Sequence, residues 1–486
     1  MPSQKLILIL KTLDNQDWRE FDRYVRSPFF NRNERLVKLV DLLRKHAPDF
    51  KESVLTKEKL FEAMYGKRTE FKEQQVYDHI AFLMRLLEGY LSYRQFQEDE
   101  AMESRYLLNA FVFRNLPEHF ERAFKKQKRS QEKKTYRNPS YHLSRFFAER
   151  EANQLAVLAH RPDYVQITER MVDHLDQFFI ASRLQHGCSK LIYQEVWNTQ
   201  IDTSFLENIL AFLEAEGKGY LEFPEIGVYY HIFKMLSSET ATELHYEAFK
   251  NLIGKYSARF SSEENYVLYG YAQNYVTSQL NAGKSEYIKE LFRIYQEILQ
   301  KEVFLINGYL DAGAYKNMVT VGLRLSEYDW VANFLDQYRE YLHPSHQNAA
   351  YHYNVGQYHY AKGDYSKALR ELLQTELMDV DYHLNVRHMQ LKIYFEQEED
   401  EALYSLMDAF SSYLKRNRQV SDNKLQAYRT LVRFIRKAAR LRQHSYTYKE
   451  ETFNRQKAAL LEELKNVPNL PNRSWLIERV ETIEGN

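Results

Sequence analysis

Residues 349–374 read AAYHYNVGQYHYAKGDYSKALRELLQ. Their apolar spacing predicts two helices joined by a Lys-Gly-Asp turn at residues 362–364. The glycine of this turn can end the first helix in a left-handed conformation, and the aspartate can cap the second helix. Gly356 and Ala368 offer small surfaces where two helix backbones can approach closely. The stretch therefore predicts an antiparallel helical hairpin.

Residues 355–369 of this hairpin follow the pattern V-G-x-x-x-Y-x-x-G-D-Y-x-x-A-L, which resembles the core of one tetratricopeptide repeat. Three further turn-and-helix openings align with Gly363, and their anchors are Gly283, Ser326 and Glu398. The four anchors are separated by 43, 37 and 35 residues, near the period of about 34 residues of such repeats. The resemblance implies an all-α fold, in which helical hairpins stack into a right-handed superhelix (an α-solenoid) with a concave groove.

The composition supports an all-helical chain without disulfides. Pro and Gly number 10 and 15 among 486 residues, too few for a protein rich in short strands and turns. The formal net charge is zero, so the chain as a whole has no electrostatic attraction to nucleic acid or membranes. Cys188 is the single cysteine, and the apolar runs are too short for a signal peptide or a membrane span. We therefore expect a cytoplasmic protein without membrane insertion.

Local patterns divide the chain into four parts. Residues 1–98 predict a small N-terminal helical domain, and residues 99–138 predict a charged helical connector. Residues 139–467 predict the helical-repeat array, and residues 468–486 predict a C-terminal capping segment. The Ser-Pro-Phe-Phe-Asn stretch at residues 27–31 resembles the opening of a family of uncharacterised bacterial proteins with helical-repeat bodies. That resemblance implies the same fold and no particular chemistry.

Ser/Thr-x-x-Glu patterns predict three helix starts within the array, because the two side chains of such a pair can satisfy backbone donors at a helix N-terminus. The predicted capping boxes pair Ser204 with Glu207, Thr240 with Glu243, and Ser261 with Glu264. Three helix starts in one region indicate a succession of separate helices.

The resemblance to tetratricopeptide repeats also implies which side chains face a partner, because the first helix of each repeat lines the groove. In two successive repeats the groove-facing residues are expected to be Tyr353, Gln357, Tyr360, Arg387, Leu391 and Tyr394. Repeats that clamp a C-terminal carboxylate use a lysine and an asparagine here, so Tyr353 and Gln357 do not imply that ligand. This mixture of side chains suits an extended or helical protein segment. The alternative is that these residues only pack against adjacent repeats.

A strip of arginines is the second candidate contact surface. Four arginines step by 4, 3 and 4 residues and so share one helix face: Arg429, Arg433, Arg436 and Arg440. Residues 423–449 contain no acidic side chain. The strip either pairs with acidic side chains of a neighbouring helix or docks an acidic protein or nucleic-acid phosphates.

Motifs for catalysis, nucleotide binding or metal binding do not stand out in this sequence. We therefore expect no enzyme activity, no cofactor and no metal, and interpret the chain as a non-catalytic scaffold that binds a protein or peptide. The alternative is a regulator whose N-terminal domain binds nucleic acid while the repeats sense a partner. The helix expected at residues 76–91 is too apolar to be a good DNA-recognition helix, so this alternative is the less favoured one.

Overall fold

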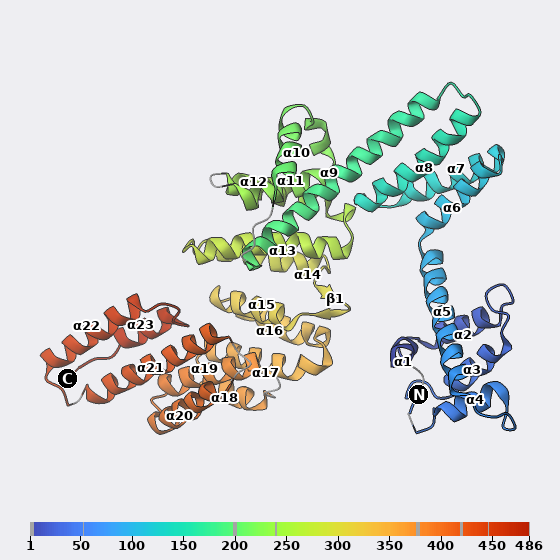
Figure 1. Cartoon of the computed structure of the whole chain (residues 1–486). Coiled ribbons are helices and arrows are strands. Elements are labelled where there is room, and N and C mark those ends of the chain that lie inside the picture. The colour runs from blue at the N-terminus through green and yellow to red at the C-terminus, as the bar shows by residue number, and fades with distance from the viewer. Residues whose placement is uncertain are drawn as a thin grey trace. The chain divides into compact units, whose positions relative to one another are not determined.

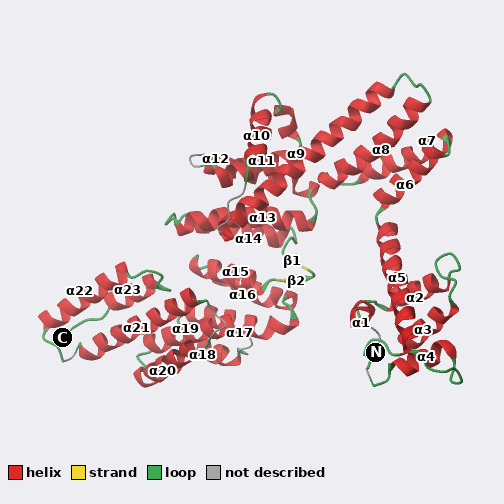
Figure 2. Cartoon of the chain, viewed as in Figure 1, coloured by secondary structure: helices red, strands yellow, loops and turns green. Residues whose placement is uncertain are grey.

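The computed structural model describes residues 4–51, 53–197, 202–238, 241–375, 380–417, 421–445 and 447–485. These ranges form 23 α-helices, three short 3₁₀ helices and one hairpin of two two-residue strands (Figures 1 and 2). The predicted all-α fold class is therefore confirmed. None of the helices in these ranges combines the length and apolar character that a membrane span requires.

The chain divides into two compact units, residues 1–233 and residues 234–486, with the boundary inside α11. The helices up to this boundary are α1 (Gln4–Leu10), α2 (Asn15–Arg26), α3 (Glu34–Lys45), α4 (Lys57–Tyr65), α5 (Glu73–Glu98), α6 (Glu100–Phe113), α7 (Pro117–Lys133), α8 (Pro139–Leu158), α9 (Tyr164–Trp197), α10 (Ser204–Ala215), η1 (Lys218–Glu222) and α11 (Pro224–Ser237).

Helices α1 to α5 enclose the first core of this unit. The apolar stripe of α5 provides Val76, Leu83 and Leu87, which are buried against the other four helices. Helix α2 ends at Arg26, just before Ser27 and the proline that follows it, and the side chain of Asn33 caps α3. Because the apolar stripe of α5 is buried in the core, these side chains cannot contact DNA. A second apolar cluster lies among α6, α7, α8 and α9.

The second unit contains the hairpins of the predicted array. Its elements are α12 (Thr242–Tyr256), η2 (Ser257–Arg259), α13 (Ser262–Asn281), α14 (Tyr287–Gln300), β1 (Leu305–Ile306), β2 (Tyr309–Leu310), α15 (Ala312–Arg324), α16 (Tyr328–Tyr338), η3 (Arg339–Tyr341), α17 (Pro344–Ala361), α18 (Tyr365–Gln374), α19 (Val380–Glu396), α20 (Asp400–Arg416), α21 (Asp422–His444), α22 (Glu450–Asn466) and α23 (Arg473–Glu481).

One turn geometry connects the two helices in four hairpins of the second unit, α13–α14, α15–α16, α17–α18 and α19–α20. Between α17 and α18, Gly363 has a φ of 78°, its N–H donates to the carbonyl of Tyr360, and the N–H of Asp364 donates to the carbonyl of His359. This pair of bonds satisfies carbonyls that the end of the helix leaves without partners. The same pair of bonds occurs around seven residues with positive φ in the described ranges: Asn115, His160, Gly283, Glu302, Ser326, Gly363 and Glu398. The turn at Glu302 follows the end of α14 and so lies between two hairpins. The four anchors aligned in the sequence are therefore structurally equivalent, and two more such turns lie in the first unit.

The close approach of α17 and α18 is also confirmed. A Cβ added to Gly356 would lie 3.0 Å from Cδ2 of Leu372 and 3.5 Å from the carbonyl oxygen of Ala368. Ala368 and Leu372 are buried on the facing side of α18. A larger side chain at residue 356 would therefore push the two helices apart.

The three predicted capping boxes have different outcomes. The box at Ser261 and Glu264 is present at the start of α13, so that prediction is confirmed. The box at Ser204 is wrong, because α10 begins at Ser204 and its N-cap residue is Thr203, whose side chain accepts no backbone hydrogen bond. There the hydroxyl of Thr203 donates to the carboxylate of Glu207, and the N–H of Ser204 donates to Asp202 instead. The box predicted at Thr240 lies outside the described residues.

We predict that Glu398→Gly stabilises the protein. Glu398 is exposed and holds a φ of 57°, a region that disfavours every side chain with a Cβ and that glycine accepts. Relief of this strain should raise the free energy of unfolding by about 0.5–1 kcal/mol in urea titrations.

The neighbouring Glu399 supplies the control for this test. It is exposed too but has an ordinary φ of −79°, so Glu399→Gly should leave stability unchanged or lower it. If the two variants shift the free energy of unfolding equally, the left-handed turn at Glu398 does not strain the chain.

Candidate functional site

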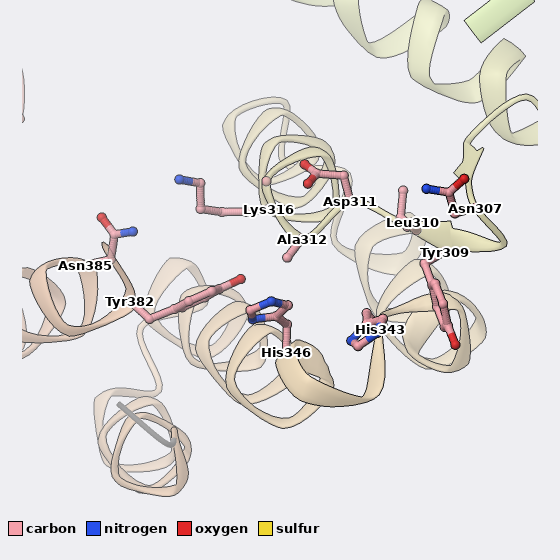
Figure 3. A pocket seen from close by; sticks show the side chains of 11 residues that line it. Asn307, Tyr309, Leu310, Asp311, Ala312, Lys316, His343, His346, Tyr382 and Asn385 are labelled. Carbon is pink, nitrogen blue, oxygen red and sulfur yellow. The ribbon is translucent and has the colours of Figure 1, made fainter. Parts of the chain in front are cut away.

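A pocket of about 650 Å³ opens in the second unit, where the β1–β2 hairpin meets the N-terminal turns of α15, α17 and α19 (Figure 3). Its lining consists of Asn307, Tyr309, Leu310, Asp311, Ala312, Gly313, Lys316, His343, His346, Tyr382 and Asn385. These three helices are the first helices of successive hairpins. The pocket therefore lies on the layer of helices that the sequence predicted to face a partner.

The strands and helix caps fix the rim of the pocket. Asn307 and Gly308 both have positive φ and form the two-residue turn between β1 and β2. Asp311 follows the second strand and caps α15, since its carboxylate accepts from the N–H of Ala314 at 2.8 Å. His343 caps α17 in the same way, with Nδ1 accepting from a backbone N–H at 3.2 Å. The two caps hold both helix starts at the pocket.

Hydrogen-bond donors predominate among the polar groups of the pocket. Lys316 contributes an ammonium group that has no ion pair within the described residues. The side-chain oxygen of Asn385 accepts from the hydroxyl of Tyr428 at 3.3 Å, which leaves the NH₂ group of Asn385 to donate. In the tautomer in which Nδ1 of His343 accepts from the N–H of Ser345, Nε2 carries the proton and can donate. Asp311 is the one acidic residue among the described residues of the lining, and its carboxylate already accepts from the N–H of Ala314. The remaining donors suit a ligand rich in carbonyl or carboxylate oxygens.

Tyr353 supports the pocket from behind rather than lining it. Its side chain is only 6% exposed, and its ring lies edge-on to that of Tyr382, with the centroids 5.7 Å apart. Burial raises the pKa of Tyr353 well above the usual tyrosine value, so its hydroxyl stays protonated. Tyr353 therefore fixes the position of a pocket residue and cannot itself contact a partner.

The other predicted groove residues are also absent from the pocket lining. Leu391 is 0% exposed in the core around α19 to α23, and Tyr394 packs against that core. Gln357 donates to the side chain of Asn354, and Arg387 donates to the buried side chain of Gln390. The assignment of Tyr353 and Leu391 to an open groove was wrong. Periodicity identified helix faces but could not show which face the neighbouring helices cover.

The last helix, α23, covers the C-terminal part of the α19 face. Trp475 and Arg479 both donate to Oε1 of Glu396, at 2.7 Å and 2.8 Å. The predicted groove residue Tyr360 donates to the same oxygen at 3.3 Å, and the ammonium group of Lys392 lies 4.4 Å from the centre of its ring. Burial lowers the pKa of Lys392 to about 8, an effect that Glu396 partly offsets. The segment predicted as a C-terminal cap thus occupies the place where Tyr360 was expected to meet a partner.

The arginine strip lies on α21 and is engaged only in part. The guanidinium group of Arg436 pairs with Asp408 of α20 at 2.6 Å, and Arg429 donates to the carbonyl of Leu414 at 2.8 Å. Arg433 and Arg440 are exposed and have no ion pair within the described residues. Arg429 and Arg436 therefore bind α20, and of these two only Arg436 forms the predicted ion pair with an acidic side chain of the described residues. Docking by Arg433 and Arg440 stays a prediction.

A polar cluster lies inside the first unit, where α8 packs against α9 and α11. His142 is 4% exposed, its Nε2 lies 2.6 Å from Oε1 of Glu225, and its Nδ1 lies 3.4 Å from Nδ1 of His174. One turn further along α8, Arg145 donates to the buried carboxylate of Glu149 at 3.0 Å. Because these groups bond to one another, the cluster links the three helices, and we assign it no catalytic chemistry. No group of three His, Cys, Asp or Glu side chains in the described ranges could hold a metal ion.

We predict that Arg436→Glu lowers the free energy of unfolding, because the new carboxylate at residue 436 would face and repel the carboxylate of Asp408. The pair is partly exposed, so the loss should be about 0.5–1 kcal/mol in urea titrations at low salt. Arg433→Glu changes the same charge on the same helix without breaking a pair, and should leave stability unchanged. Adding Asp408→Arg to Arg436→Glu should restore most of the loss; if it does not, the ion pair does not stabilise the α20–α21 contact.

We also predict that stability falls as the pH is lowered from about 6.5 to about 4. Burial, with the positive charge of Arg145, lowers the pKa of His174 to about 4. The folded state therefore binds a proton at His174 only at a lower pH than the unfolded state does. The stabilisation is complete above pH 6.5 and is lost as the pH falls through 4. His174→Gln should remove on the order of 1–2 kcal/mol of this pH dependence, measured by urea unfolding. His119→Gln, a change at an exposed residue, should retain the dependence of the parent; equal behaviour of both variants contradicts this account.

Comparison with protein-family models, with curated protein sequences and with solved structures finds no match to this chain. The resemblances at residues 355–369 and at residues 27–31 therefore stay predictions. The function has to be argued from the pocket, its surroundings and the packing of the helices.

Proposed function

We propose that this chain is a non-catalytic scaffold that binds a protein or peptide segment along the face of α15, α17 and α19. The helical hairpins are proposed to stack as a tetratricopeptide-like array with a right-handed superhelical course. Two features of the second unit support this architecture. Helix α17 packs against its partner α18 and against the first helices on both sides, α15 and α19. The turns within four successive hairpins also share one geometry, as expected of repeated units.

The pocket is the observation that carries the proposal. Its volume of about 650 Å³ is sufficient for several residues of a bound segment. Lys316 and the NH₂ group of Asn385 can donate to peptide carbonyls or to an acidic side chain, while Tyr309, which is 39% exposed, provides flat apolar contact area. An extended segment with at least one acidic residue fits this combination of groups best.

The position of α23 explains why the partner should bind at the N-terminal turns of α15, α17 and α19 rather than at the C-terminal part of α19. The C-terminal part of α19 is already occupied through Glu396, which accepts from Trp475 and Arg479. The N-terminal turns of α15, α17 and α19 remain open at the pocket. The same helical layer thus holds a segment of its own chain at one end and offers an open site at the other.

A display library of random peptides of about twelve residues, selected against the full chain, tests the proposal. We expect enriched peptides to carry Asp or Glu, because Lys316 is the pocket's uncompensated cation. Lys316→Glu should weaken the binding of these peptides about tenfold or more, measured by fluorescence anisotropy.

Lys415 provides the matched control, because it is an exposed lysine on α20 outside the pocket. Lys415→Glu should leave the affinity within about twofold of the parent, as expected for a charge away from the contact. If the selected peptides bind the Lys316→Glu variant and the parent equally tightly, the binding surface lies elsewhere and the proposal that the pocket binds them is contradicted.

A further inference from the structure

The first unit presents an unusually exposed aromatic side chain on a rigid turn. Phe29 is 86% exposed, although hydrogen bonds hold the turn that carries it. The N–H groups of Phe30 and Asn31 both donate to the carbonyl of Ser27, at 3.1 Å and 2.9 Å. The side-chain NH₂ of Asn31 donates to the carbonyls of Val25 and residue 33. An apolar ring held in solvent by so ordered a turn indicates a contact surface.

Two hollows flank this turn and share Tyr24 and Phe30 as lining residues. Phe30 stacks on Tyr24 with the ring centroids 4.0 Å apart, and Phe29 meets Phe30 edge-on at 4.9 Å. The smaller hollow, of about 250 Å³, lies between α2 and α5. The larger hollow, of about 600 Å³, has an apolar floor that includes Leu36 and Phe82. Together these form a continuous aromatic surface, which we call the Phe29 surface.

Arginines outnumber carboxylates around the Phe29 surface, although Glu20 and the ion-paired Arg94 also line the smaller hollow. Arg23 lines the smaller hollow, while Arg32 and Arg85 line the larger one. In the described part of the chain, none of these three arginines has a carboxylate partner, whereas the neighbouring Arg26 pairs with both Asp22 and Asp41. No acidic residue lines the larger hollow. Any partner that fills it therefore gains by bringing carboxylates to the two arginines at its rim.

We propose that the Phe29 surface docks an acidic segment of a partner protein, whose apolar or aromatic side chain enters the hollow between Phe30 and Phe82. Carboxylates of the segment pair with Arg32 and Arg85, and Phe29 covers the inserted side chain. Apolar insertion supplies affinity, and the arginines fix the register.

Nucleic acid fits this surface less well. A single strand needs a continuous track of cations along its phosphates, and the arginines here stand singly around apolar hollows. A protein segment needs only two carboxylates at the rim, so it is the favoured occupant.

Fluorescence anisotropy with the full chain and three labelled probes tests the proposal. The first probe is a pool of peptides of about twelve residues in which Asp or Glu alternates with Phe, Leu or Trp. The second pool has Asn and Gln in place of the acidic residues, and the third probe is a thymidine oligonucleotide of similar length. We expect saturable binding of the acidic pool, weakened about tenfold or more by Phe29→Ser and by the double change Arg32→Glu with Arg85→Glu.

Matched changes keep the test specific to this surface. Leu8→Ser alters another exposed apolar residue, and Arg19→Glu with Lys38→Glu reverses two exposed charges that line neither hollow. These variants should bind the acidic pool like the parent, and melting temperatures should confirm that all variants fold. The proposal is overturned if the acidic pool binds no better than the neutral pool. It is equally overturned if the Phe29 and arginine variants bind like the parent, or if the oligonucleotide binds more tightly than the acidic pool.

Discussion

The left-handed turn that ends the first helix of four successive hairpins is the constraint on which these hairpins depend. A helix ends with carbonyl groups that have no partner in the helix, and burying them unsatisfied would destabilise the fold. At Gly363, two backbone bonds satisfy these carbonyls and reverse the chain within three residues. The next helix then returns along the first one, where Gly356 lets the side chain of Leu372 approach closely. Packing of the hairpin therefore follows from the turn that closes it.

Several parts of this architecture could be predicted from the sequence because they depend on local chemistry. Glycine and aspartate at residues 363 and 364 identified one turn, and its alignment located equivalent turns at Ser326 and Glu398, where no glycine is present. The turns at Asn115, His160 and Glu302 were missed, since none of the three lies in a recognisable repeat pattern. Backbone geometry at such positions is imposed by packing of the two helices, which residue type alone does not reveal.

The candidate site was harder to predict because it joins residues from separate hairpins. One local signal was overlooked: Asn307 and Gly308 stand between two short apolar runs, a strong indication of a β-hairpin. The burial of Leu391 and the contact of Trp475 with Glu396 depend on residues far apart in the chain. Helical periodicity could place side chains on a face but could not show that α23 covers part of it.

The account assigns the open part of the α15, α17 and α19 layer to partner binding. Hydrogen–deuterium exchange of the full chain, with and without a library-selected peptide, tests this assignment most directly. The account predicts that bound peptide slows exchange at residues 307–316, 343–346 and 382–385, which line the pocket. Protection confined to the arginine strip of α21, or to the contact of α23 with α19, would contradict it.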